Sequence, residues 1–177
     1  MLGNSQKRLG RVAARIINKT AAKHKTQISK KLREFVKVNK TTADDSLSIS
    51  SKAHEPHHLF SKVVVSQTYK IGLNRFKPKQ TKKGVTYAIS KTGRKLIKGA
   101  FIIEKLGGHV FERENPYDPK QTRKFNRALA SPKRGTTMYN VYVKHDLDKW
   151  SQRETAKEMK FQFDVQLKSA LKKLAKQ

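Results

Sequence analysis

The sequence predicts an α+β fold, in which a small, mostly antiparallel sheet is flanked by a long N-terminal amphipathic helix and a C-terminal amphipathic helix. Apolar residues recur at helical spacing near both ends of the chain, and β-branched and aromatic residues alternate with polar ones between them. The 177 residues are a number that one hydrophobic core commonly serves. We therefore expect a single domain spanning residues 1–177.

The N-terminal region, residues 1–38, is predicted to be helical. An apolar stripe with spacings of three and four residues predicts an amphipathic helix over residues 5–23, with basic residues off the stripe. The stripe comprises Leu9, Val12, Ala13, Ile16, Ile17, Thr20 and Ala21. A second, shorter helix is expected over residues 26–35, with Thr26 as its N-cap. Residues 41–58 are small and polar, so they predict a loop with one short strand, SLSIS.

Residues 61–114 are predicted to form the central β region. The run KVVVSQTYKIGLNRF is rich in β-branched and aromatic residues, and GVTYAIS alternates in the same manner. Between them, KPKQTKKG contains Pro78 and Gly84 and predicts a basic hairpin tip. Further along, AFII predicts a buried strand, Gly107 and Gly108 a tight turn, and HVFERE the returning strand.

The C-terminal part is predicted to contain a long basic loop, a strand and a helix. Residues 115–135 hold three prolines and clustered Arg and Lys, which predict a loop with one helical turn near residues 125–129. The run MYNVYVK predicts a last short strand. Ser151 and Glu154 have the form of a capping box, which predicts a helix over residues 151–177. Its apolar face is expected to comprise Met159, Phe163, Leu167, Ala170, Leu171 and Leu174.

The charge of the chain is strongly positive and unevenly distributed. Lys and Arg number 41 against 13 Asp and Glu, which gives a formal net charge of +28. Residues 1–40 carry 12 basic residues and one acidic residue, and residues 61–100 carry 11 basic residues and none acidic. An anionic partner is therefore expected: nucleic acid, an acidic protein or an acidic membrane.

A membrane is the weakest of these candidates. No apolar run approaches the roughly 20 residues that span a bilayer, and residues 1–10 lack the apolar core of a signal peptide. We expect no membrane partner and a protein made and used in the cytosol. The chain has no cysteine, which excludes disulfides, thiolate nucleophiles and cysteine-ligated zinc.

The residues that can support catalysis or bind a metal are few. His54, Glu55, His57 and His58 form the one cluster of metal-type ligands, but Pro56 breaks it and no HExxH spacing is present, so a solvated loop is favoured. His109 follows the glycine pair without a recognisable catalytic partner, and we expect it to be structural, hydrogen-bonded at the turn. GxSxG, GxGxxG and Walker spacings are absent. The sequence predicts neither an enzyme nor a cofactor.

Nucleic-acid contact is the chemical hypothesis that the charge favours most. In residues 61–100, basic residues are interleaved with Tyr69, Phe76 and Tyr87, so phosphates and bases are both conceivable targets. The phosphate-facing groups are expected in one of two places, the hairpin tip or the first helix. They are Lys77, Lys79, Lys82 and Lys83, or Arg8, Arg11 and Arg15. The alternative is that the charge only offsets an acidic partner or keeps the protein soluble.

The order of these features resembles the minor tail protein Z family of lambda-like tailed phages. The resemblance is carried by the basic N-terminal helix, ISKKLREFVKV, GVTYAIS, KGAFI and GGHVFERE. Its two short motifs are Gly99, Ala100, Phe101 and Ile102, then Gly108, His109, Val110 and Phe111, followed by Arg113. After Glu114 the chain departs from the family, because a longer basic segment replaces a leucine-proline segment.

The resemblance implies a structural virion protein without enzymatic activity, assembled in the host cytoplasm. Such a protein acts in tail completion, as a neck component that joins tail to head and lines the DNA channel. It implies a homo-oligomeric, commonly hexameric ring, with a connector, a tail terminator or a tail tube and the genomic DNA as partners. Two alternatives remain open: a non-specific nucleic-acid-binding protein of the ribosome or nucleoid, and a metal-dependent nuclease that uses the histidine cluster.

Overall fold

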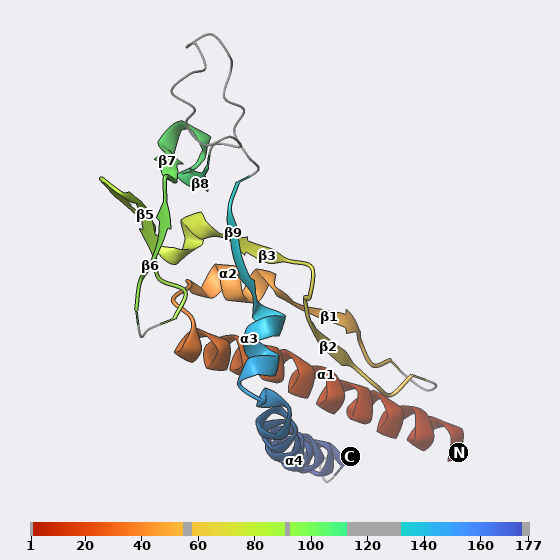
Figure 1. Ribbon diagram of the computed structural model, residues 1–177. Coiled ribbons are helices and arrows are strands. Elements are labelled where there is room, and N and C mark those ends of the chain that lie inside the picture. Colours follow the sequence, from red (N-terminus) through yellow and green to blue (C-terminus); the bar gives the residue numbers. More distant parts are fainter. Residues whose placement is uncertain (1, 55–57, 91–92, 113–131, 175–177) are drawn as a thin grey trace.

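The computed structural model describes residues 2–54, 58–90, 93–112 and 132–174, and it confirms the α+β fold with a long helix at each end (Figure 1). The α-helices are α1 (Leu2–Phe35), α2 (Lys40–Asp45), α3 (Met138–Lys144) and α4 (Leu147–Leu174). The strands are β1 (Leu47–Ser51), β2 (Lys62–Val65), β3 (Lys70–Gly72), β4 (Lys79–Thr81), β5 (Gly84–Tyr87), β6 (Lys95–Lys98), β7 (Phe101–Ile103), β8 (His109–Phe111) and β9 (Arg134–Thr137). Two 3₁₀ turns are η1 (Leu73–Phe76) and η2 (Glu104–Leu106).

The strands form several small antiparallel ladders. The pairs are β1–β2, β3–β9 and β7–β8, and β4, β5 and β6 form a three-stranded sheet. Figure 1 shows the three-stranded sheet at one end of the molecule, while the N-terminal half of α1 extends toward the other end beside β1 and β2. Among the strands, β1 and β2 lie against α1, and the largest buried cluster gathers at its C-terminal part.

The hydrophobic core gathers residues from most elements around the C-terminal third of α1. Ile28, Leu32 and Val36 recur at spacings of four residues and are almost fully buried. They pack with residues of α2, η1 and the later strands and helices. These residues are Ala43, Leu47, Ile71, Leu73, Phe76, Val85, Ala100, Val110, Met138, Val141 and Leu147.

The two predicted N-terminal helices are one continuous helix, so that prediction is wrong. No glycine or proline separates residues 5–23 from residues 26–35, and His24, near the expected break, is buried against α4. Thr26 is inside α1, where its hydroxyl donates to the carbonyl of Ala22 at 3.2 Å, so it caps nothing. The predicted loop after α1 contains the expected strand, β1, and also α2, which is capped by the side chain of Asn39.

The predicted strand MYNVYVK is helix α3, and the last strand precedes it. Thr137 accepts a hydrogen bond from the backbone N–H of Asn140 and caps the helix, in which Met138 and Val141 are buried at a spacing of three residues. The spacing of the apolar residues in this run therefore fits both a strand and a helix, and the N-cap favours the helix. β9 begins at Arg134, within the predicted loop of residues 115–135, and pairs with β3. The predicted turn at residues 125–129 lies outside the described residues.

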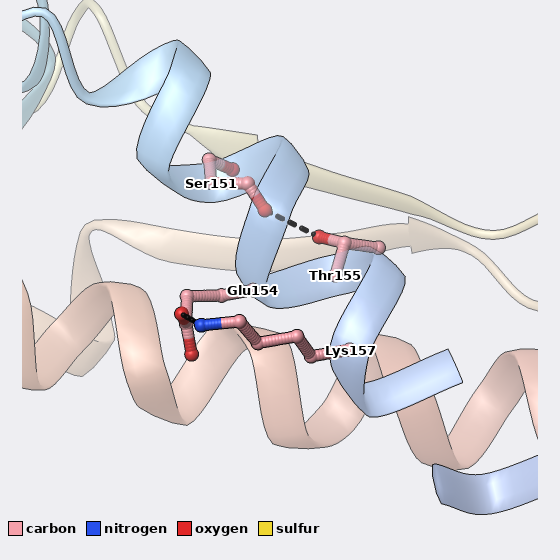
Figure 2. A network of polar contacts seen from close by, with 4 residues as sticks. All are labelled: Ser151, Glu154, Thr155 and Lys157. Carbon is pink, nitrogen blue, oxygen red and sulfur yellow. Dashed lines mark hydrogen bonds and ion pairs between the residues drawn. The ribbon is translucent and has the colours of Figure 1, made fainter. Parts of the chain in front are cut away.

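The predicted capping box does not start the C-terminal helix. α4 begins at Leu147, so Ser151 already lies inside it. Figure 2 shows the carbonyl oxygen of Ser151 accepting a hydrogen bond from the hydroxyl of Thr155 at 2.8 Å. The carboxylate of Glu154 pairs with Lys157 at 2.9 Å and does not reach back to the backbone N–H of Ser151 (Figure 2).

Two predicted hairpins are confirmed. KPKQTKKG forms the β4–β5 hairpin, in which Thr81 pairs with Gly84. The motif residues around Gly99 and Gly108 form β7, η2 and β8, in which Phe101 pairs with Phe111 and Ile102 with Val110. Arg113 and Glu114, at the end of the expected return strand, lie outside the described residues.

Candidate nucleic-acid interface

The four predicted lysines at the β4–β5 hairpin are all exposed, and we call them the tip surface: Lys77, Lys79, Lys82 and Lys83. Lys82 and Lys83 occupy the two-residue turn between Thr81 and Gly84. Gly84 has a φ of +141°, and a Cβ there would overlap the carbonyl oxygen of Ile97, so this tight turn requires glycine. Lys79 lies at the other end of the β4–β5 ladder from the turn, opposite Thr86, and Lys77 precedes β4.

Arg94 is exposed beside the tip surface, and its guanidinium binds the protein's own backbone. It donates to the carbonyl oxygens of Lys77 and Thr86, both at 2.8 Å, and to the hydroxyl of Thr86 at 3.2 Å. These bonds hold the start of the hairpin to β5. Arg94 is therefore a structural cation.

A second basic surface is a groove between the N-terminal half of α1 and the β1–β2 hairpin, which we call the α1 groove. Arg11, Arg15 and Lys19 line it from one face of α1, and Lys52 lines it from the segment after β1. The remaining lining residues are small or apolar, or carry neutral polar groups: Ala14, Asn18, Ala22, Ile49 and Ser61. No carboxylate lines the groove among the described residues. Arg8 lies on the same helical face by spacing and is exposed, but it does not line the groove.

Asn18 fixes one wall of the α1 groove to the other. Its side-chain nitrogen donates to the carbonyl of Ala53 at 2.7 Å, and its side-chain oxygen accepts from the backbone N–H of Ala53 at 2.8 Å. Ala53 is 5% exposed and Asn18 is half-buried, so both bonds are partly shielded from water. Lys52, the preceding residue, is thereby held beside the basic face of α1.

The two basic surfaces lie at opposite ends of the molecule (Figure 1). The structure brings Arg11 and Arg15 together in the groove, and it separates them from the four lysines of the tip surface. Sequence reasoning did not single out Asn18 or Lys52 as part of a site. No local signal marks them, because their position depends on how the β1–β2 hairpin folds back on α1.

The aromatic residues expected near the bases are mostly unavailable. Phe76 is fully buried in the core, so the prediction that its ring meets a base is wrong. Tyr87 is half-buried against the core, and Tyr69 is exposed. Base stacking is therefore supported at Tyr69 alone among these three residues, and the candidate interface is built from cations.

The histidine residues show no metal site in the described part of the chain. His54 and His58 form an isolated bridge at the end of the β1–β2 hairpin, with stacked rings whose centroids are 4.7 Å apart. Glu55 and His57 lie outside the described residues, and no group of three His, Cys, Asp or Glu residues within the described ranges could hold a metal ion. The buried Nδ1 of His109 has no hydrogen-bond partner among those residues, so that atom does not form the bond expected at the turn.

Beyond its first turn, α4 presents polar residues to α1 and leaves its large apolar residues at positions 159–167 exposed. His24 of α1 lies 2.8 Å from the hydroxyl of Ser151, and Gln166 on the same face of α4 is 7% exposed. Thr155 and Gln162 share this face by helical spacing and are half-buried. The predicted apolar face is therefore not buried where it is described: Met159, Phe163 and Leu167 are 42%, 51% and 42% exposed.

The exposed apolar residues of α4 lie on both sides of its polar face. At about 100° per residue, Phe161 and Val165 lie to one side, and Met159, Phe163 and Leu167 to the other. We call these the first and second apolar flanks; their residues are 41% to 59% exposed. Lys157, Lys160, Asp164 and Lys168 lie opposite the polar face, toward solvent. Sequence reasoning missed the first flank because the sequence was fitted to a single apolar face.

Comparison with known protein families, curated proteins and solved structures gives no match to this chain. The family resemblance therefore rests on the short motifs of the sequence. None of the described helices combines the length and apolar character needed to cross a bilayer.

Proposed function

We propose that this chain is a structural, non-enzymatic assembly protein of the tail-completion or neck type of tailed phages. In this proposal, copies of the chain form a ring at the head-proximal end of the tail, joining tail to head around the DNA path. The observation that carries the proposal is the exposure of five large apolar residues within nine positions of α4. Exposed apolar surface of this kind is typical of sites that another protein covers.

The position of the two apolar flanks favours a ring over a simple pair. A subunit in a closed ring uses two different surfaces, one for each neighbour, whereas a symmetric dimer uses one surface twice. The first and second flanks lie on opposite sides of α4 and can each meet a different neighbour. The mixture of Asp, Glu and Lys on α4 also reduces charge repulsion there, in contrast to the uniformly basic segments of the chain.

Sedimentation of flank variants tests the assembly proposal. We expect Phe161→Glu in the first flank and Phe163→Glu in the second each to abolish ring formation, because a carboxylate would be desolvated at the interface. Lys160→Glu, on the solvent face of the same helix, is the matched control and should assemble normally. If the flanks meet each other across each contact, mixing the two flank variants yields a two-subunit species. Unchanged assembly of both variants would contradict the proposal.

Particles made without the protein test the proposed place of action. We expect intact heads beside unjoined or defective tails in electron micrographs, and restoration of joined particles by the wild-type chain. The Lys160→Glu variant should restore joining, whereas the Phe161→Glu variant should not. Normal particles in the absence of the chain would rule out a role in tail completion.

A non-specific nucleic-acid-binding protein of the ribosome or nucleoid is the second candidate, and the α1 groove favours it. A binding titration against salt separates the two. Tight binding of duplex DNA by the monomer, with a steep salt dependence, supports this second function. Weak binding that strengthens only in the assembled ring supports the tail protein.

A further inference from the structure

We infer that the α1 groove binds the phosphate backbone of duplex nucleic acid and that the tip surface does not. The inference rests on the proposed function, in which the assembled protein surrounds a DNA path. It adds the surface, the residues and the chemistry of the contact. The groove contributes Arg11, Arg15, Lys19 and Lys52 as cations and Asn18 as the residue that positions one of them.

The cations of the α1 groove form a row suited to a repeating anion. Arg11, Arg15 and Lys19 recur every four residues, which places them about 6 Å apart along the helix axis. One strand of duplex DNA carries a charge about every 3.4 Å along the duplex axis, and because the strand winds around that axis its adjacent phosphates are farther apart than this rise. A strand lying along α1 can therefore present successive phosphates to successive cations of the row. A single small anion would engage only part of this row.

The groove is also organised before any ligand binds. The pair of hydrogen bonds between Asn18 and Ala53 fixes Lys52 opposite the row on α1. Ala14, Ala22 and Ile49 also line the groove, and their small or apolar side chains offer bases no hydrogen-bonding groups. Prior ordering lowers the entropic penalty of binding. The arrangement therefore suits contact with the backbone, independent of sequence.

The side chains of the tip surface are less suited to binding the phosphate backbone than those of the α1 groove. Its cations are all lysines, and the nearby shallow pocket, lined by Asn74, Arg75 and Pro78, also includes the carboxylate of Glu104. The α1 groove contains two arginines, whose planar guanidinium groups bind phosphate oxygens in pairs, and no carboxylate lines it within the described residues. An acidic protein segment would also be attracted to the groove, but its carboxylates need not repeat at a regular spacing.

Two charge-matched triple variants test the inference. Arg15→Gln/Lys19→Gln/Lys52→Gln removes three groove cations, and Lys79→Gln/Lys82→Gln/Lys83→Gln removes three tip cations, so both chains have a formal charge of +28 − 3 = +25. Binding of a labelled 30-base-pair duplex is followed by fluorescence anisotropy between 50 and 300 mM NaCl, and circular dichroism verifies the fold. For the groove variant, we expect an affinity about tenfold lower and a salt slope reduced by about 2.7, from three lost phosphate contacts. The tip variant should retain the wild-type slope.

Equal losses in the two triple variants would overturn the inference, because charge alone would then explain the binding. A greater loss in the tip variant, or no duplex binding by the assembled wild type, would overturn it too. Displacement of the duplex by poly-glutamate at equal charge concentration would replace nucleic acid with an acidic protein as the partner. The assembly variants of α4 provide an independent readout. Normal ring formation by a wild type that binds no DNA refutes the groove and leaves the assembly proposal standing.

Asn18→Ala tests the positioning role without changing charge. We expect a fall in duplex affinity of a few fold, together with faster hydrogen exchange at the amide of Ala53, which loses its acceptor. Asn74→Ala, which removes a side-chain bond to Gly107 on the other part of the molecule, is the control and should leave duplex binding unchanged. Faster exchange at Ala53 with unaltered duplex affinity would remove Asn18 from the site.

Discussion

His24 is a buried histidine at the contact between α1 and α4. One ring nitrogen lies 2.8 Å from the hydroxyl of Ser151, and the residue is 7% exposed. Burial lowers the pKa of His24 below its ordinary value of 6.5, although a side-chain interaction with Gln27 and the charge of Glu154 raise it. Because the pKa is lower in the folded state, the unfolded chain binds more protons between the two pKa values.

We therefore expect the free energy of unfolding to fall as the pH drops through 6.5 toward the folded-state pKa of His24. Urea unfolding between pH 5 and pH 8 measures this change. His24→Asn keeps a polar side chain that does not titrate, so the difference between wild type and variant isolates His24 from the other histidines. Parallel pH profiles for the two proteins would show that His24 contributes no pH dependence.

Gly135 is a residue whose lack of a side chain is required by packing. A Cβ there would lie 2.5 Å from Cε2 of Phe76, a ring that is fully buried and cannot move aside easily. We expect Gly135→Ala to destabilise the fold by about 1–3 kcal/mol, as overpacked core positions do. Gly93→Ala is the control: no atom lies within 4 Å of its ideal Cβ, and the change in stability should be within about 0.5 kcal/mol. Similar urea midpoints for both variants would contradict this account of Gly135.

At the scale of the elements, two threonines have opposite roles. Thr26 lies inside α1 and is exposed, so replacing it with Ala should stabilise the protein by about 0.5 kcal/mol through helix propensity. Thr137 caps α3, and Thr137→Ala should destabilise it by about 1 kcal/mol or more, because the N–H of Asn140 loses its acceptor at 3.0 Å. Chemical denaturation measures both. A destabilising Thr26→Ala would indicate that α1 is interrupted there.

Sequence patterns predicted elements well where local chemistry decides the structure. The β4–β5 hairpin and the β7–β8 hairpin follow from their turn residues, Gly84 and the pair Gly107 and Gly108. Predictions were wrong where tertiary contacts decide: α1 continues past His24, which packs on α4, and α3 forms where an alternating run also fits a strand. The polar inner face of α4 gave no signal, because a helix is expected to bury its apolar side.

The candidate site was likewise predictable only where a local pattern marks its residues. Helical spacing identified Arg11 and Arg15 as members of one basic face of α1. The second wall of the α1 groove was not predictable, because Lys52 reaches it only through the bond pair between Asn18 and Ala53, 35 residues apart. The sequence also could not choose between the groove and the tip surface, since their separation is a property of the folded chain (Figure 1).

At the scale of the whole molecule, the charge distribution works against the stability of the isolated chain. The formal net charge is +28. The described ion pairs Lys31–Glu34, Lys133–Glu112 and Lys157–Glu154 are all at least partly exposed, and such pairs contribute little to stability. Because 41 basic residues face 13 acidic ones, repulsion exceeds attraction at low salt, and we expect a partner that supplies negative charge to stabilise the fold.

We accordingly expect the melting temperature to rise as salt is added to the isolated protein. The Debye length shortens from about 30 Å at 10 mM to about 8 Å at 150 mM, so repulsion between basic segments is screened over most of the molecule. Differential scanning calorimetry in NaCl measures the rise, which should reach several degrees by 150 mM and then flatten. KCl at equal ionic strength should give the same curve if screening, and not ion binding, is the cause. A melting temperature that falls with salt would contradict this account and would mean that attractive pairs dominate the chain's electrostatics.

Duplex DNA should stabilise the protein more than salt does. At 10 mM salt, an excess of duplex DNA should raise the melting temperature further than 150 mM NaCl does, because phosphates bound at the groove neutralise cations that mobile ions only screen.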